Sequence, residues 1–518
     1  MAQEAARDAV APVTKEATPI DFIKLESSGT LSDLKGGALG KTVWAGQPRS
    51  EILIELRDLP TRNALQSLQL LKKNILLTRN DASLIENDIP PKPGFDILTS
   101  RLRRLMDSGF YEDALTLYRT SIDDPYHEVQ ARIGILLIIY NAELPTACLE
   151  EKVLAPRYEP SRFWQLMDAV CDVKLGNTKD IETKLKDSEV LKAIFTNPAL
   201  VVPAEDESSL LGMTGLERSI LMAEGRLDFS AFVDGSHSLS SLHPLIFPLF
   251  LKAPNLPEKL KLPVLKEALT RGLVSEARLK KADPVYGRLN LMDTPEEQWE
   301  TLAPILSTET SVYDAQYFSG LLELLTPEAS DPALSPRIIA AMLLSGQEIP
   351  AFWTEKLMSG ASQNYENYAF LQALKSLGVG SEIPDVSAEN FGIGLKLLSP
   401  AAAGQVLAII ESLDKADGND HNPLKVYEKE VDLTSESHYV MHSDGLMERL
   451  KTAESKQQTG LVVLSSIQAL SGKPEDISPE TLRQVLDSLQ AVGLIEEARQ
   501  IAREWLAILL TTKKEKGE

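Results

Sequence analysis

The chain contains two cysteines, Cys148 and Cys171, and thiol chemistry is the first chemistry that its residues could support. Helical patterns lie on both sides of the Pro-containing segment 155–160, which predicts that the cysteines occupy the two arms of one helix pair. If that pair is antiparallel with its turn near residue 157, the cysteines are offset by five residues, or about 7 Å along a helix. An oblique crossing could close this gap, so a disulfide is feasible. Two buried free thiols that act as small apolar side chains are the alternative.

Two groups of residues have partial metal-ligand spacing. His438 and His442 are four residues apart and are followed by Asp444, but a metal site there would require a helix and a third ligand. Three acidic residues resemble a calcium loop in composition only, because the alternate oxygen ligands and the final Glu of such a loop are missing. These residues are Asp414, Asp417 and Asp420. We therefore expect no metal site, and the two cysteines have no nearby His pair that would complete one.

Evidence for nucleotide chemistry or catalysis is equally weak. The segment Gly36–Thr42 ends like a phosphate-binding loop, but it has one residue too few between its glycines and no apolar strand before it. The chain has no Gly-x-Ser-x-Gly nucleophile motif. If the protein were an enzyme, Glu205 or Asp206 would be the best candidate for its acid, although nothing near them supports the role. We expect no catalytic residue and no cofactor.

The elements that must position these residues are indicated by a six-residue signature that recurs three times. It occupies Gly109–Ala114, Gly272–Ala277 and Gly493–Ala498. In each copy a Gly follows a helical pattern, and an acidic residue with an Ala begins the next helical pattern. Glycine readily takes the left-handed conformation that ends a helix, acidic side chains are favourable at a helix N-terminus, and Ala permits close packing. The signature predicts repeated helix pairs of the tetratricopeptide type.

Length and charge restrict the class of protein further. At 518 residues the chain exceeds a single compact core, so several domains or an elongated repeat stack are expected. The chain has 53 Lys and Arg against 75 Asp and Glu, for a net charge of −22. This excess argues against a surface that binds nucleic acid. It serves solubility or, alternatively, attracts a basic partner. No apolar run approaches the roughly 20 residues of a transmembrane helix.

The predicted fold is all-α, an irregular solenoid of stacked antiparallel helix pairs. Residues 1–48 are rich in Ala, Gly, Ser and Thr and have little periodicity, which predicts a flexible N-terminal arm. Three helical blocks follow at residues 49–200, 201–398 and 399–518, the last with capping helices.

Part of the sequence resembles uncharacterised, exported helical-repeat proteins of alphaproteobacteria. The resemblance rests on Ala147–Leu149, followed by Phe163–Gln165, Cys171 and Leu175–Gly176, and on the helical patterns within 459–503. These motifs are structural and cover about a third of the chain. The resemblance implies a solenoid fold and export to an oxidising envelope compartment, and it implies no activity.

We therefore expect a non-catalytic protein-binding scaffold of the bacterial periplasm, whose partner and oligomeric state the sequence does not identify. The residues after Met1 lack the basic and apolar regions of a signal peptide, so either Ala2-Gln3-Glu4 is a mature start or the protein is cytosolic. A cytosolic helical adaptor with reduced thiols is one alternative. An enzyme, or a module that acts on an envelope polymer, is the other, and a cleft with a carboxylate of raised pKa would favour it.

Overall fold

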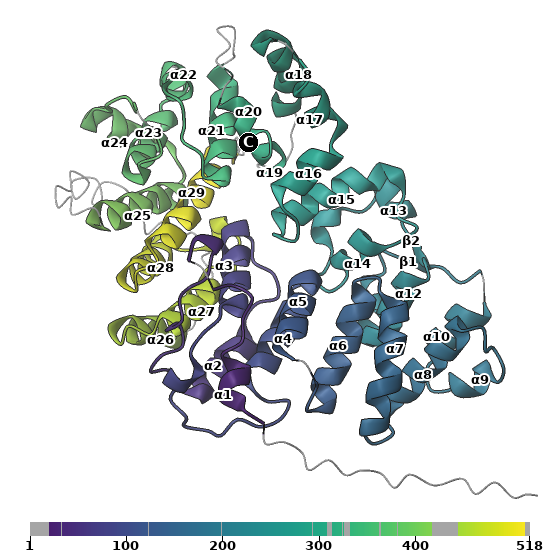
Figure 1. Cartoon of the computed structure of the whole chain (residues 1–518). Helices are drawn as coiled ribbons and strands as arrows, with labels where there is room; N and C mark the ends of the chain where they lie inside the picture. Colours follow the sequence, from purple (N-terminus) through teal and green to yellow (C-terminus); the bar gives the residue numbers. More distant parts are fainter. Residues whose placement is uncertain are drawn as a thin grey trace, which may run out of the picture.

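A computed structural model describes residues 20–512, apart from residues 33, 123, 198, 293, 324 and 381 and the stretches 308–312, 326–331, 362–363 and 417–443. The described chain is built from helices, which confirms the predicted all-α class (Figure 1). Its only named strands are β1 (Val202–Pro203) and β2 (Leu227–Asp228), which pair in parallel. No helix in these residues is both long and apolar enough to cross a membrane.

The helices follow one another along the chain, with longer connections after α1, α3 and α13. In the first part of the chain they are α1 (Phe22–Glu26), α2 (Arg49–Asp58), α3 (Gln66–Leu77), α4 (Ile97–Asp107), α5 (Tyr111–Ser121), α6 (Glu128–Tyr140), α7 (Leu144–Leu154), α8 (Arg162–Lys174), α9 (Ile181–Lys184) and α10 (Glu189–Thr196). In the middle they are α11 (Glu207–Gly212), α12 (Gly215–Ala223), α13 (Ser230–Val233), α14 (Phe247–Lys252), α15 (Glu258–Thr270), α16 (Glu276–Ala282), α17 (Pro284–Leu289), α18 (Pro295–Ser307), α19 (Tyr313–Gln316), α20 (Ser319–Leu322) and α21 (Ser335–Ser345). The last are α22 (Ala351–Ala361), α23 (Glu366–Leu377), α24 (Ala388–Leu397), α25 (Pro400–Ala416), α26 (Asp444–Ser455), α27 (Thr459–Ala469), α28 (Pro479–Ala491) and α29 (Ile495–Thr511).

All three signature glycines end a helix in the predicted way. Gly109, Gly272 and Gly493 have φ angles of 82°, 69° and 85°. At the first of them the amide of Gly109 donates to the carbonyl of Met106 (2.9 Å) and the next amide, of Phe110, donates to Leu105 (2.8 Å). The other two glycines make the same pair of hydrogen bonds, which is the Schellman motif. The signature therefore marks the α4–α5, α15–α16 and α28–α29 helix pairs, whose members contact each other.

Two further helix ends use the same motif without glycine. Ala142 follows α6 with φ 64° and Gln457 follows α26 with φ 56°. The amides of Ala142 and Glu143 donate to the carbonyls of Ile139 and Ile138, as in the signature turns. An L-residue pays a steric cost of about 1 kcal/mol in this conformation. A search for Gly therefore misses these turns.

Residues 20–48 differ from the predicted flexible arm. The carboxylate of Glu26 in α1 is buried, forms an ion pair with Arg49 and accepts a hydrogen bond from the amide of Ile97 (3.0 Å). Trp44 is fully buried, and its ring lies so close to Gly460 that a Cβ there would come within 2.3 Å of it. The prediction of an arm was wrong for these residues because a few apolar side chains are sufficient to anchor a segment of low periodicity. Residues 1–19 lie outside the described part.

The order of contacts shows both a row of neighbours and a closure. From α4 to α8 each helix contacts the next one along the chain. The chain then returns, with α12 packed against α6, and later α21 packs against α29. Figure 1 shows the N-terminal helices α1–α3 beside the C-terminal helices α26–α29, and α3 contacts both α27 and α29. Repeats of an open stack contact only their neighbours, so the contacts of α3 with α27 and α29 are not features of the predicted stack.

A buried carboxylate stabilises the closure. Glu504 of α29 accepts hydrogen bonds from the amides of Gln66 and Ser67, both 2.6 Å long, at the first turn of α3. Leu65, the residue before α3, makes no side-chain hydrogen bond that caps the helix. Glu504 therefore accepts the hydrogen bonds of the first amides of α3, which a Ser or Asp at the N-cap position usually accepts. Tyr313 also donates its hydroxyl to Glu504. Burial raises the pKa of Glu504, and these hydrogen bonds oppose the rise.

Candidate functional site

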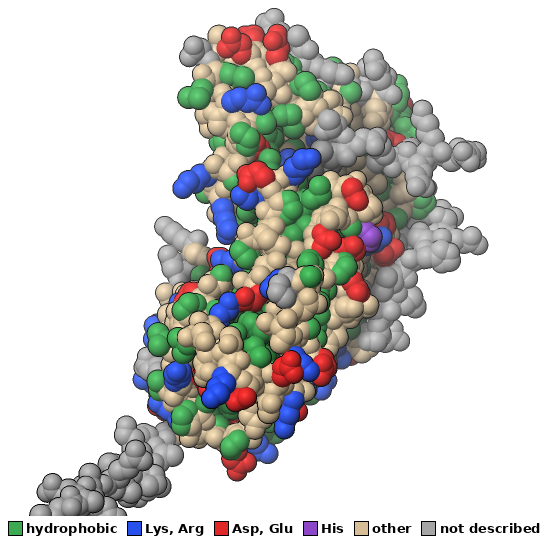
Figure 2. Space-filling model, turned by 90° about the vertical axis from the view of Figure 1, so that its right-hand side faces the viewer, with side chains coloured by type: hydrophobic (Ala, Val, Ile, Leu, Met, Phe, Trp, Pro, Cys, Tyr) green, Lys and Arg blue, Asp and Glu red, His purple; other side chains and the backbone are tan. Residues whose placement is uncertain are grey.

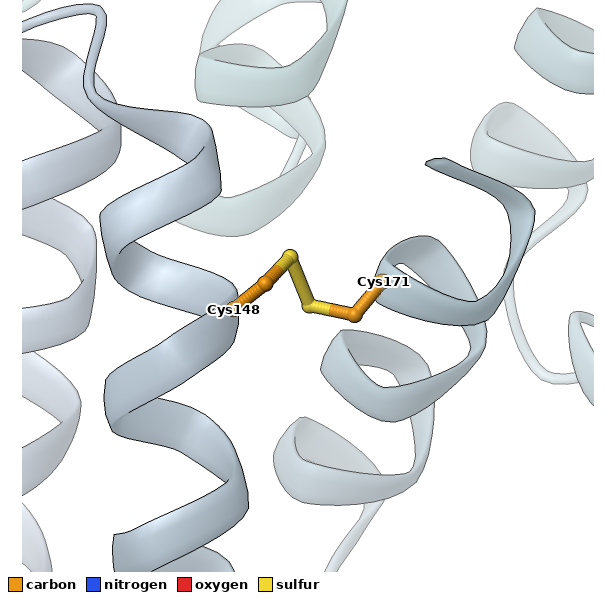
Figure 3. The surroundings of a disulfide bond; sticks show 2 residues. All are labelled: Cys148 and Cys171. Atoms are coloured by element: carbon orange, nitrogen blue, oxygen red, sulfur yellow. A yellow bond between two sulfur atoms is a disulfide. The ribbon is translucent and has the colours of Figure 1, made fainter. Parts of the chain in front are cut away.

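Cys148 and Cys171 come together between α7 and α8. Their Sγ atoms lie 2.10 Å apart, at disulfide distance, and their Cα atoms are 5.4 Å apart. Figure 3 shows the two side chains pointing toward each other from the two helices. The five-residue offset expected from the sequence is thus accommodated in the helix pair. The residue Cys148 is 8% exposed, whereas Cys171 is fully buried.

Local sequence determines where these two helices begin and end. α7 starts directly after the left-handed Ala142 turn and carries Pro145 in its first turn, where a missing amide hydrogen has no cost. α8 begins after Ser161 and ends at Lys174. Gly176 follows α8 with φ 84° and completes another Schellman turn. These two turns fix the ends of α7 and α8 that lie nearest the groove described next.

A groove with a volume of about 750 Å³ lies beside the two sulfur atoms. It is bounded by one side of α7 with its preceding turn, by the C-terminal ends of α8, α12 and α14, and by the residues just after α14. Its apolar lining comes from Leu144, Pro145, Leu149, Leu175, Ala223 and Pro254. We call it the disulfide groove. Leu149 and Leu175 are 71% and 68% exposed, so apolar surface continues from the groove onto its rim.

The charged residues of the disulfide groove are mainly lysines. Lys152, Lys174 and Lys252 line it together with Glu224. Lys174 forms an ion pair with Glu224, and Lys252 pairs with Glu112 at 2.6 Å. No carboxylate of the described residues lies within ion-pairing distance of Lys152, which is exposed. A protein with a net charge of −22 therefore presents a groove whose free charge is positive.

Charge is mixed on at least one large face of the molecule. Figure 2 shows Lys and Arg interspersed with Asp and Glu, among scattered hydrophobic side chains, on the face that lies at the right of Figure 1. Among the residues drawn in colour, the acidic side chains of this face lie next to basic ones and form no continuous acidic surface.

Glu151 lies on the inner side of α7 in the same helix pair. It is almost fully buried, and its Oε2 atom has no hydrogen-bond partner. Burial raises the pKa of Glu151, and the carboxylates of Asp168 and Asp172 add to the rise. Sequence patterns do not single out this residue, because Glu151 and Glu150 look alike in an acidic helical stretch.

The residues considered for catalysis have structural roles or no supporting geometry. Asp206 caps α11 by accepting from the amide of Ser209 (3.1 Å), and its pKa is lowered by hydrogen bonds from Ser209 and Ser208. Glu205 has one buried carboxylate oxygen without a partner. The segment 34–46 forms a 3-10 turn (Leu34–Gly36) and further turns rather than a strand, a loop and a helix.

The possible metal ligands stay without support. His438, His442, Asp417 and Asp420 lie outside the described residues. Within the described part, no cluster of His, Cys, Asp or Glu could hold a metal ion.

One cleft contains a carboxylate of raised pKa. Asp107, the last residue of α4, lines a cleft of about 510 Å³ together with Phe95, Arg103 and Arg104. Burial raises the pKa of Asp107, and Arg104 opposes the rise from 3.4 Å away. Its position at the negative end of the helix dipole also favours the protonated form. Ser50, Ser100 and Arg57 also line the cleft, and Asp107 is the one carboxylate among its lining residues.

Comparisons with protein-family models, with curated proteins and with solved structures found no match. The geometry of the described residues is therefore the basis for a functional assignment. It brings together Cys148 and Cys171, which the sequence offered as a possible disulfide. It adds Lys152 to the site, together with Leu149 and Leu175, which the sequence indicated only as parts of a structural motif.

Proposed function

We propose that this protein is a non-catalytic protein-binding scaffold and that the disulfide groove holds an apolar segment of its partner. The observation that carries the proposal is the exposure of Leu149 and Leu175 on the rim of an apolar groove. Exposed apolar surface that continues into a groove is typical of interaction sites. Water contacts the apolar surface of these two leucines in the free protein, and covering that surface with a partner would contribute favourably to binding.

A protein segment fits this shape better than a small ligand. A small molecule within the groove would contact its floor and leave the rim leucines in water, whereas an amphipathic helix laid across it would cover both. Lys152 would then face the polar side of that helix, so acidic residues flanking its apolar face would be favoured. The proposed occupant is an apolar segment with acidic flanks.

The same proposal includes a fold type and a compartment. The row from α4 to α8, in which each helix contacts the next, supports a solenoid-like part similar to tetratricopeptide repeats. The cysteine pair at disulfide distance supports an oxidising compartment such as the periplasm, because such bonds are rare in the cytosol. A cytosolic adaptor would keep both thiols reduced. Asp107, a carboxylate of raised pKa in a cleft, is the observation that favours the enzyme alternative, and no second carboxylate is among the residues that line that cleft.

The test is site-specific photo-crosslinking in the native cell followed by affinity measurement. A photoreactive residue replaces Leu149 in one variant and Leu291, which is 82% exposed and lies outside the groove, in the control. We expect a discrete protein adduct at position 149 and none at 291. The captured protein is then purified, and its affinity is measured for the wild type, L149R, L175R and L291R.

The affinity measurements decide between the outcomes. Truncating a central apolar contact typically costs 1–2 kcal/mol, so L149R and L175R should each weaken binding by about tenfold, and L291R should not. Equal adducts at both positions, or unchanged affinity in both groove variants, would contradict the proposed site. Far-UV circular dichroism checks that each variant is folded.

A further inference from the structure

The disulfide groove gives solvent a route to the sulfur atoms. Both cysteines line the groove, and Cys148 retains some exposure while Cys171 has none. A structural disulfide buried on all sides can exchange only when the protein unfolds around it. Here both cysteines line a groove of about 750 Å³, which is large enough to admit a small thiol, and Cys148 is the more exposed of the two.

Two lysines line the disulfide groove near the cysteines, and Lys174 is ion-paired with Glu224, which leaves Lys152 as the cation available to a thiolate. Lys152 lies four residues after Cys148 on α7, and Lys174 lies three residues after Cys171 on α8. These spacings place each lysine on the same helix face as its cysteine. Both lysines line the groove. A nearby cation attracts an incoming thiolate and stabilises the thiolate that leaves.

We propose that the Cys148–Cys171 disulfide is opened in the folded protein by a dithiol that enters the disulfide groove, and that this opening weakens binding there. In the first step the thiolate of the dithiol attacks Sγ of Cys148, the sulfur–sulfur bond breaks, and Cys171 leaves as a thiolate that takes up a proton. In the second step the other thiol of the reductant, as its thiolate, attacks the mixed disulfide. Cys148 leaves and is protonated, and the reductant ends as a disulfide.

The consequence for binding follows from packing. Two non-bonded sulfur atoms cannot remain at bonding distance, so α7 and α8 must move apart or turn one cysteine away. Both helices form walls of the groove. Leu149 directly follows Cys148 in the chain, and Leu175 lies four residues after Cys171. If the helices move apart on reduction, Leu149 and Leu175 move with them, and the rim that the proposed partner covers is displaced. This second half of the proposal rests on the proposed function, whereas the chemistry of the disulfide does not.

The first experiment measures reduction of the full-length oxidised protein by dithiothreitol, without denaturant, by alkylation and intact mass. We expect the rate to rise in proportion to the dithiothreitol concentration and to change little in low urea. Lys152→Glu should slow it by about fivefold to tenfold at low salt, from the reversal of one charge near the sulfur. Lys451→Glu, on an exposed face of α26, is the matched control and should have no effect. A rate that is independent of dithiothreitol, or that rises with urea like global unfolding, would overturn the proposal.

Two single-cysteine variants test which sulfur is attacked. In Cys171→Ser the remaining Cys148 should react with an aromatic disulfide reagent at least about tenfold faster than the remaining Cys171 does in Cys148→Ser, because accessibility governs such rates. Equal rates would contradict attack at Cys148. The wild-type kinetics decide the main question even if a variant fails to fold.

The regulatory half needs the crosslinked partner. Its affinity is measured for the oxidised protein and for the reduced, alkylated protein, and a loss of about tenfold is expected. Equal affinities would overturn the regulation while leaving the binding site intact. Failure of crosslinking at Leu149 would instead count against the proposed function and leave the reduction kinetics unaffected.

Discussion

Removing the bond between Cys148 and Cys171 should destabilise the α7–α8 pair by about 3 kcal/mol. The cysteines are separated by 23 residues in the sequence. In the chain-entropy relation for cross-links, a closed loop of this length restricts the unfolded state by about 3 kcal/mol at 25 °C. The perturbation has two forms: chemical reduction of the wild type, and the double variant Cys148→Ala/Cys171→Ala.

Comparing the two forms separates the effect of the covalent bond on stability from the effect of the buried cysteine side chains. Reduced wild-type protein keeps both sulfur atoms and loses only the covalent bond, whereas the double variant also loses the two buried sulfurs. We therefore expect the double variant to be less stable than the reduced wild type by about 1 kcal/mol or more, from the lost burial and the small cavity. Oxidised wild-type protein is the common reference.

Local hydrogen exchange is the appropriate assay, because a chain of 518 residues is not expected to unfold in a single step. The amides of α7 and α8 should lose about 3 kcal/mol of protection on reduction, which is roughly a hundredfold faster exchange. The amides of α28, which does not contact α7 or α8, should be unchanged. A loss below about 1 kcal/mol in α7 and α8 would refute the reasoning, because the helix pair would then be held by its packing alone.

The remaining predictions concern a turn and a buried lysine. Gly109→Ala should cost about 2–3 kcal/mol, because it combines a left-handed φ with a Cβ only 2.7 Å from Pro248, whereas Gly493→Ala has open space and should cost only about 1 kcal/mol. Equal losses of hydrogen-exchange protection in α4–α5 of the first variant and in α28–α29 of the second would contradict this difference. Burial lowers the pKa of Lys72 from 10.5 to about 7, although its Nζ donates to two carbonyl oxygens. As the pH rises, the folded protein therefore loses this proton before the unfolded chain does. Between about pH 7 and 10 the free energy of unfolding of the wild type should rise, relative to that of Lys72→Met, by up to about 1.4 kcal/mol per pH unit. A stability difference that is constant between about pH 6.5 and 9.5 would show that Lys72 has an ordinary pKa.

The sequence predicted the features of this fold that depend on local chemistry. The three signature glycines end helices as expected, since a left-handed residue after a helix strongly favours Gly. The same rule did not find Ala142 or Gln457, where surrounding structure imposes the conformation on a less suitable residue. The prediction of an arm was wrong for residues 20–48 because burial of Trp44 depends on Gly460, which is remote in the sequence.

The candidate site was predictable only in part for a similar reason. The cysteine pair could be considered from helical spacing, because both residues belong to one helix pair. The disulfide groove could not be predicted, because its walls come from four helices, α7, α8, α12 and α14, that are spread along the sequence. In a sequence, an exposed Leu149 on an amphipathic helix cannot be distinguished from a core leucine. Its neighbours Ala223 and Pro254 are assembled around it only by the return of the chain.

The closure between the chain ends determines how the site should be studied. Glu504 supplies the missing cap of α3 from the far end of the sequence, and Arg49 neutralises the buried Glu26. A fragment that began at residue 49 would remove Glu26 and leave the buried Arg49 without its ion-pair partner, which typically costs several kcal/mol. A fragment that ended before α29 would leave the first amides of α3 without acceptors. The disulfide groove lies on neither end, but α4 connects α3 to the row of helices that carries it. Loss of binding in such a fragment would therefore report the broken closure, and point variants such as L149R in the full chain are the informative ones.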